Sequence, residues 1–189
     1  MIDVVIGDGP HSLEIQEICN SIFAFNPKIV GICEEEDIDL ESRIVMGLGS
    51  HDVRHRSFLN LSQLGYTFTT LIHPSTIISK NARILSGSVC MPGVVISGNT
   101  EIGQCTLINW NSSIGHDVII GECSVVAPQV AISGGVKIGA GSLIGAGAVI
   151  LPNIEVGENS IIGAGSVVTS NVASNSTIVG VPGRAMKIR

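Results

Sequence analysis

The chain has 189 residues, enough for one or two domains, and 44% of them are hydrophobic although only 3% are aromatic. Its 23 glycines and its aliphatic bias favour a repetitive fold with many tight turns over a helical bundle or an ordinary sandwich. The net charge of −6 argues against nucleic-acid binding. No apolar run reaches the roughly 18 residues that a membrane span needs.

The first part of the chain alternates strand-like and helix-like patterns. A short apolar strand leads into a glycine turn, and apolar residues then recur at helical spacing behind Pro10 or Ser12. We expect strands over 4–6, 28–33 and 44–49, and helices over 12–23 and 54–64. This pattern predicts a small βαβαβ Rossmann-like unit, about half of a dinucleotide-binding fold, spanning residues 1–72.

Two segments of this unit are candidates for substrate binding. Gly7 and Gly9 form a partial dinucleotide fingerprint, in which glycines after a strand let a phosphate approach the helix N-terminus. A plain tight turn is the alternative. Glu34 and Glu35 follow the second strand and could accept hydrogen bonds from a nucleobase or ribose, whereas the next two acidic residues read as a solvated loop.

Residues 73–189 form a second unit, which carries a six-residue repeat over residues 78–168. Stepping by six from Ile78 to Val168 meets Ile or Val at every position except Cys90. Small or β-branched residues recur two positions earlier, and glycine recurs one position later. A helix would show apolar spacing near 3.6 and a simple strand would show spacing of two, so a period of six fits neither.

This period predicts a coil with three short flat faces and a turn at each corner. Three hexads make one full turn of the coil, the aliphatic residue of each hexad points to the axis, and glycine relieves backbone strain near the corner. Stacked turns should lie about 4.8 Å apart, the usual spacing of paired strands.

The solenoid segment contains one histidine within its repeats, His116, followed by Asp117. Residues one coil away are Gly98 and Gly134, so the space beside the imidazole should be open. An imidazole titrates near neutral pH and can take a proton from an attacking amine, and Asp117 could orient it. Gly134 and Gly135 could bring a backbone N–H to an oxyanion. A surface histidine and a structural corner are the competing interpretations.

The hexads resemble the hexapeptide-repeat, left-handed β-helix acyltransferases, and the order of the two units resembles bacterial nucleotide-sugar N-acetyltransferases and sialic acid O-acetyltransferases. This resemblance implies a left-handed parallel β-helix, acetyl-CoA as cosubstrate and no metal. It also implies a cytoplasmic homotrimer that acetylates the amine of a nucleotide-linked sugar, often a 4-amino-6-deoxy sugar for surface glycans. The small unit would hold the nucleotide, and acetyl-CoA would lie along the solenoid between subunits.

Several residues match the pattern of that family. His116 and Asp117 fit its catalytic motif. The residues expected to bind the substrate are Gly7, Gly9, His11, Glu34, Glu35 and Asn109. The expected acetyl-CoA contacts are Gly134, Gly135, Gly145, Ala146, Ala164 and Arg184. Two departures concern ligand placement: Pro10 removes a backbone donor, and Val125 stands where many relatives have a second histidine.

Other functions stay open at this point. The same base would serve O-acetylation of a sugar hydroxyl, and a non-enzymatic nucleotide-sugar-binding scaffold would bind ligand without turnover. A metal-dependent hydratase of the same architecture needs several histidines around zinc, which the repeats do not supply. The five cysteines include no CxxC pair and read as free thiols of a reducing cytoplasm.

Overall fold

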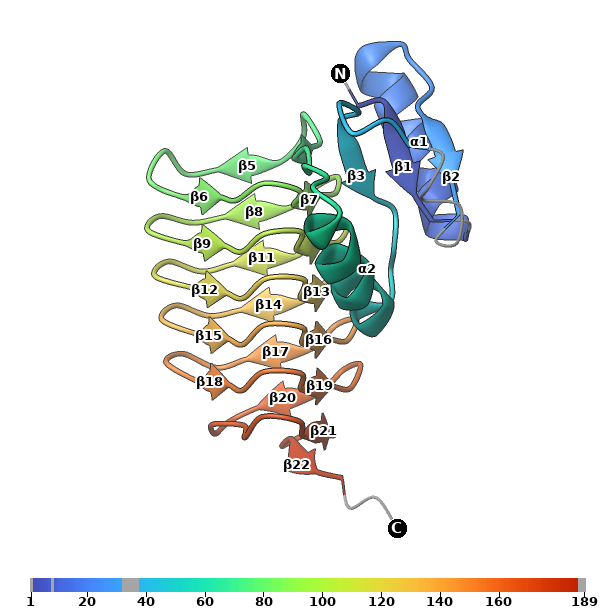
Figure 1. The fold of residues 1–189 in the computed structure, drawn as a ribbon. Coiled ribbons are helices and arrows are strands. Elements are labelled where there is room, and N and C mark those ends of the chain that lie inside the picture. Colours follow the sequence, from blue (N-terminus) through green and yellow to red (C-terminus); the bar gives the residue numbers. More distant parts are fainter. Residues whose placement is uncertain (1, 8, 32–37, 187–189) are drawn as a thin grey trace.

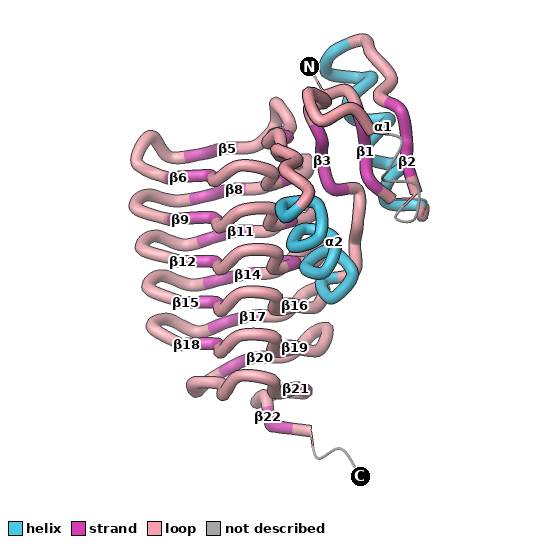
Figure 2. Tube along the Cα trace, viewed as in Figure 1, coloured by secondary structure: helices cyan, strands magenta, loops and turns pink. Residues whose placement is uncertain are grey.

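The computed structural model describes residues 2–7, 9–31 and 38–186. It consists of a small N-terminal unit beside a tall solenoid, and the helices lie in the N-terminal unit (Figures 1 and 2). The predicted fold class, a Rossmann-like half-domain followed by a left-handed parallel β-helix, is confirmed. No helix in the described ranges is long and apolar enough to cross a membrane.

The N-terminal unit is a three-stranded parallel sheet in the order β2-β1-β3. Its elements are β1 Val4–Ile6, α1 Pro10–Phe23, β2 Lys28–Val30, β3 Ile44–Met46 and α2 His51–Gln63. The described elements run strand, helix, strand, strand, helix, close to the places where the sequence predicts strands and helices. The described residues 38–43 form no helix, and after α2 Phe68 pairs with Ile44 of β3 in an isolated parallel bridge before the chain enters the solenoid.

The solenoid has three faces. We name one by the unit that packs on it and the other two by the character of their outward side chains. The docked face, beneath the N-terminal unit, contains β4 Leu71–Ile72, β7 Val89–Cys90, β10 Leu107–Ile108, β13 Val125–Val126, β16 Leu143–Ile144, β19 Ile161–Ile162, β21 Thr177–Val179 and β22 Arg184–Ala185. The apolar face contains β5 Ile77–Ile78, β8 Val95–Ile96, β11 Ser113–Ile114, β14 Ala131–Ile132, β17 Val149–Ile150 and β20 Val167–Val168. The charged face contains β6 Arg83–Ile84, β9 Glu101–Ile102, β12 Ile119–Ile120, β15 Lys137–Ile138 and β18 Glu155–Val156.

Along each face a strand pairs in parallel with the strand one coil further on, as the three-hexad turn predicts. Within the described ranges, β21 and β22 are the exception and pair antiparallel. The aliphatic residue of each hexad is buried along the axis, for example Ile102, Ile108 and Ile144. Hydroxyl side chains close the gaps between coils, since Ser88 Oγ donates to Gly103 O over 2.7 Å and Thr100 Oγ1 donates to Gly115 O over 2.7 Å. The small or hydroxyl position of the hexad is therefore a hydrogen-bonding position between coils.

The two units share hydrophobic cores. Val5 and Ile15 of the N-terminal unit are buried in one cluster with Leu107 and Val125 of the docked face. The strand β4 forms the end of the unit predicted to span residues 1–72, yet it already pairs with β7, so the solenoid sheet begins at Leu71. The N-terminal unit is thereby fixed on one face and leaves the other two uncovered.

A buried arginine also ties the units together. Arg54 of α2 is fully buried, and three backbone carbonyls accept from its guanidinium: Met46 O at 3.1 Å, Leu48 O at 2.8 Å and Cys105 O in the solenoid. Because these carbonyls belong to both units, one side chain links β3, α2 and a solenoid corner.

Candidate active site

Three columns of turns run down the solenoid, one at each corner. The first corner lies between the docked and apolar faces, the second between the apolar and charged faces, and the third between the charged and docked faces. Each candidate residue can be assigned to one of these corners or to the N-terminal unit. The apolar face separates the first corner from the second.

His116 and Asp117 lie at the second corner, in the turn between β11 and β12. In Figure 1 these turns form the outer edge of the solenoid, on the side away from the N-terminal unit. The pair sits there because Ile114 and Val118 on either side are buried in the solenoid core. Asp117 adopts φ +57, a left-handed conformation that aspartate tolerates better than most residues.

The His116 ring is held from one side. Its Nδ1 lies 2.7 Å from Asp117 Oδ2, and because a carboxylate only accepts, Nδ1 donates and leaves Nε2 as the atom available to take a proton. Asp117 Oδ1 accepts from Asn99 Nδ2 at 3.2 Å. The hydrogen bonds from His116 and then Asn99 hold the pKa of the Asp117 carboxyl below its usual range. The carboxylate therefore stays charged and keeps the imidazole oriented.

Gly134 makes the space for this ring. A Cβ placed on Gly134 would lie 2.6 Å from His116 Nε2, so any side chain there would displace the imidazole. Next to it, the Gly135 N–H donates to His116 O over 2.9 Å and is thus already used. No hydrogen bond joins the Gly134 N–H to another described residue. Of the two glycine amides considered for an oxyanion site, the Gly134 N–H is the one still free.

The predicted acetyl-CoA residues divide between corners. Gly134 and Gly135 lie with His116, whereas Gly145, Ala146 and Ala164 lie in first-corner turns. Arg184 is exposed in β22, and its Nη1 donates to Gly183 O over 2.8 Å.

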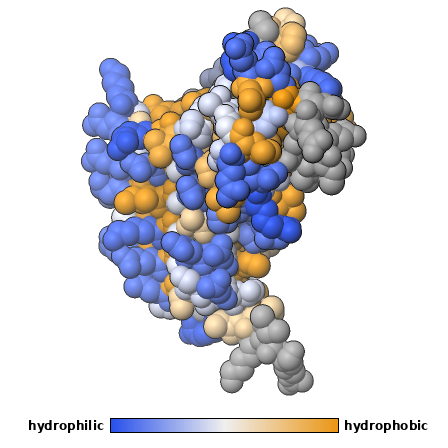
Figure 3. Space-filling model, in the orientation of Figure 1, coloured by the Kyte–Doolittle hydropathy of each residue, from blue (hydrophilic) through white to orange (hydrophobic). Residues whose placement is uncertain are grey.

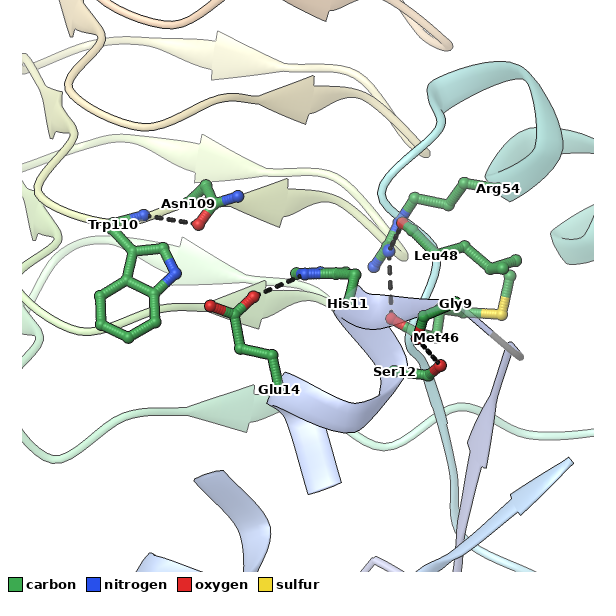
Figure 4. Close-up of polar contacts among 9 residues, drawn as sticks. All are labelled: Gly9, His11, Ser12, Glu14, Met46, Leu48, Arg54, Asn109 and Trp110. Carbon is green, nitrogen blue, oxygen red and sulfur yellow. Dashed lines mark hydrogen bonds and ion pairs between the residues drawn. The ribbon is translucent and has the colours of Figure 1, made fainter. Parts of the chain in front are cut away.

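The predicted acceptor residues lie on the side of the first corner. Asn109 is in the turn after β10, and its Oδ1 accepts from the Trp110 N–H over 2.8 Å. Figure 4 shows His11 and Glu14 of α1 on the side that faces this turn. His11 Nδ1 is 2.9 Å from Glu14 Oε2, while burial lowers the pKa of His11 against the opposing effect of Glu14. His11 Nε2 and Arg54 Nη2 are buried without a partner among the described residues.

The remaining residues singled out from the sequence lie in the N-terminal unit and on the docked face. Gly7 has φ +133, which favours glycine, and Gly9 caps α1 without a side-chain hydrogen bond. Glu34 and Glu35 lie outside the described residues. Val125 is buried between the N-terminal unit and the docked face. The sequence interpretation missed Asn99, although it precedes Asp117 by one full coil of the predicted period.

One chain therefore holds the parts of the site at separate places. The candidate base His116 and its glycines are at the second corner, and the candidate acceptor residues and several CoA candidates are at the first corner and in the N-terminal unit. The His116 side chain is 71% exposed, on a convex edge that cannot enclose a ligand alone.

Comparisons with known proteins agree with the repeat and with the fold. The family "bacterial transferase hexapeptide (six repeats)" matches residues 135–170, and the "hexapeptide repeat of succinyl-transferase" matches residues 111–152. The structure of PerB from Caulobacter crescentus, in complex with CoA and GDP-perosamine, is similar with a TM-score of 0.84 and 26% identity, covering 99% of this chain and 98% of that one.

Two other solved structures are alike over nearly their full length. The acetyltransferase domain of PglB from Neisseria gonorrhoeae, in complex with acetyl coenzyme A, has a TM-score of 0.89 and 24% identity, covering 97% of this chain and 98% of that one. WeeI from Acinetobacter baumannii has a TM-score of 0.88 and 23% identity, covering 98% of this chain and 100% of that one. The predicted resemblance of this chain to hexapeptide-repeat nucleotide-sugar acetyltransferases is thereby confirmed.

Proposed function

We propose that this protein is an acetyl-CoA-dependent N-acetyltransferase that acts on the amino group of a nucleotide-linked amino sugar. The observation that carries the proposal is the second-corner site, where Asp117 orients His116 and Gly134 leaves room beside Nε2. PerB, which shares the fold over the whole chain, binds CoA and GDP-perosamine, and the PglB domain binds acetyl coenzyme A. Acetyl coenzyme A is an acetyl donor, and a nucleotide-linked amino sugar supplies the amine that accepts the acetyl group.

The chemistry follows from one base. The sugar nitrogen attacks the thioester carbonyl as the free amine, and His116 Nε2 accepts the proton that this nitrogen loses as the C–N bond forms. The carbonyl oxygen gains negative charge in the tetrahedral intermediate, and the Gly134 N–H is the candidate donor to it. When the intermediate collapses, the C–S bond breaks and the imidazolium returns a proton to the leaving CoA thiolate. Asp117 stabilises the imidazolium formed between these steps.

We also propose that the site is completed by a second copy of the chain packed on the apolar face. The outward residues of this face carry no charge: they are Ile77, Val95, Ser113, Ala131, Val149 and Val167. The charged face differs, since its ion pairs Arg83–Glu101 at 2.9 Å and Lys137–Glu155 at 2.8 Å suit solvent. The docked face is occupied over β4 to β13 by the N-terminal unit. Apolar surface remains visible along the solenoid between polar side chains (Figure 3).

The position of the apolar face gives the assembly a chemical consequence. It is bordered by the first corner on one side and the second corner on the other. When apolar faces pack around a threefold axis, the second corner of one subunit approaches the first corner of its neighbour. His116 then meets the Asn109 turn and the CoA candidates of another chain, and the cleft between subunits encloses the thioester. A homotrimer with three shared sites follows from this arrangement. Its location in the cytoplasm is a separate proposal, which rests on the family resemblance.

The function is tested with purified protein, acetyl-CoA and a panel of nucleotide-linked amino sugars, by following release of the free CoA thiol. We expect turnover with an amine acceptor and little with the matching hydroxyl analogue. His116→Ala should reduce kcat by roughly 10²–10⁴-fold, the range for loss of a general base. Turnover of hydroxyl acceptors alone would assign O-acetylation, and ligand binding without thiol release would assign a scaffold. Either result would refute the proposal.

A further inference from the structure

We propose that Asn99 is a positioning residue of the transfer reaction, acting on His116 through Asp117. The inference rests on the proposed function, because it assigns Asn99 a part in that same site. Three side chains from two successive coils form a chain: Asn99 Nδ2 donates to Asp117 Oδ1 over 3.2 Å, and His116 Nδ1 donates to Asp117 Oδ2 over 2.7 Å.

The geometry fixes the direction of this chain. Both carboxylate oxygens of Asp117 are engaged, one by each neighbour, so the carboxylate plane cannot rotate without losing a hydrogen bond. Its third constraint is the backbone, since the Asp117 N–H donates to Gly98 O over 3.0 Å. The coil above and the ring beside it thus hold the carboxylate from two directions. With Asp117 removed or rotated, the described residues offer no other partner within hydrogen-bonding distance of His116 Nδ1.

The backbone conformation at residue 99 favours asparagine by itself, so this structural role must be separated from the proposed action of the side chain on Asp117. Asn99 has φ +57, a left-handed conformation that asparagine tolerates, and Asn111, Asn153, Asn159 and Asn175 have similar φ in other turns of the solenoid. What distinguishes Asn99 is the residue one coil further on. At that position in its column stands Asp117, a carboxylate that also contacts the base, so the amide of Asn99 reaches the reacting ring through one intermediate.

The packing proposed for the trimer strengthens this inference. In one chain Asn99, His116 and Asp117 are exposed, and water competes for their hydrogen bonds. A neighbouring subunit that encloses the thioester also removes water from this edge. Where water is excluded, a carboxylate that lacks hydrogen-bond partners is less stable than it would be in solvent. The hydrogen bonds that hold Asp117 are stronger there and therefore orient the imidazole more firmly.

Two variants isolate the role. Asn99→Gly removes the amide and keeps the left-handed backbone, because glycine adopts positive φ without strain. Asn159→Gly is the matched control, since Asn159 has φ +52 at the third corner, away from the apolar face. The first measurement is the NMR titration of the Asp117 carboxyl. We expect the pKa of Asp117 to rise toward its usual value in Asn99→Gly and to stay unchanged in Asn159→Gly.

The second measurement is a double-mutant cycle with Asp117→Gly, which also retains a residue suited to positive φ. We expect Asn99→Gly to lower kcat roughly 3–10-fold in the wild-type background, in line with the usual net contribution of one hydrogen bond, with the KM for acetyl-CoA unchanged. In the Asp117→Gly background it should change kcat less than about 2-fold, because the residue through which it acts is absent.

The outcomes separate the possibilities. An unchanged Asp117 pKa in Asn99→Gly overturns the proposal. An equal loss of kcat in both backgrounds also overturns it, because Asn99 would then act on the fold alone. If the wild-type protein transfers no acetyl group to any acceptor, the proposed function fails, while the titration still decides whether Asn99 holds Asp117.

Discussion

Glycine is required at the solenoid corners for two separate physical reasons. Gly135 has φ +71, a conformation that side chains rarely adopt. Gly115 has no positive φ, yet a Cβ on it would lie 2.7 Å from Gly134 N of the next coil. The regular glycine after each axial residue was expected to relieve backbone strain. At Gly115 the actual reason is the close approach of the following coil, as it is for most glycines of that position.

Gly134→Ala tests the space beside the base. Because its Cβ would fall 2.6 Å from His116 Nε2, the ring must rotate away from Asp117 or the coil must shift. We expect kcat to fall at least about 10-fold, since a displaced base loses its alignment with the amine. Steady-state kinetics measures this, with circular dichroism to show that the solenoid persists.

Gly98→Ala is the matched control, because Gly98 lies in the same column one coil before His116 and a Cβ there would be 3.4 Å from Ser79 Oγ, an ordinary contact. This variant should keep most of the activity. Equal kcat in Gly134→Ala and Gly98→Ala would show that the ring does not depend on the space at Gly134.

At the scale of elements, α2 is held by its one buried charge. Replacing Arg54 by Met removes the guanidinium and leaves carbonyls of both units without their donor. We expect the free energy of unfolding to fall by about 2–4 kcal/mol. The fluorescence of Trp110, the single tryptophan, reports on this transition because Trp110 packs against the cluster between the units.

Arg56→Met on the same helix is the control. Arg56 is exposed and pairs with Asp52 at 2.8 Å, so its removal should change the unfolding midpoint little. If both variants unfolded at the same denaturant concentration, Arg54 would not be the link between the units.

The repeat made the solenoid predictable from sequence, strand by strand. Each hexad specifies its strand locally, and the pairing partner always lies one coil away along the chain, so no long-range information is needed. The second strand and the two helices of the N-terminal unit were also predicted, although α2 begins at His51, three residues before the expected Arg54. The sequence of its first turn is polar and gives no apolar periodicity there.

Contacts that depend on docking could not be predicted. Arg54 and Cys105 are 51 residues apart and meet only because α2 lies against the third corner. His116, Asp117 and Gly134 were predictable as a group, since they are neighbours in one column of the repeat. Their separation from the Asn109 turn was not anticipated, because the period does not reveal which face the N-terminal unit covers.

At the scale of the whole molecule, the apolar face should control assembly. Val95 on the apolar face is 40% exposed and Ile119 on the charged face is 47% exposed, so the two positions are closely matched. Val95→Glu should dissociate the trimer and abolish activity, because a charge would be buried against a neighbouring subunit. Ile119→Glu should leave both intact. Light scattering at assay concentration measures this, and a Val95→Glu trimer of full activity would exclude the face as the interface.

Subunit mixing tests the central claim most directly. His116→Ala and Asn109→Ala chains, carrying different tags, are co-expressed, and the mixed particles are purified and assayed against each variant alone. If each site combines His116 of one chain with Asn109 of the next, about one third of the sites in the purified mixed trimers contain both native residues, because each such trimer holds one fully native site. We predict that mixed particles recover activity toward that fraction, although each variant alone has little. Mixed particles no more active than the separate variants would contradict the shared site and place both residues in the same chain's reaction.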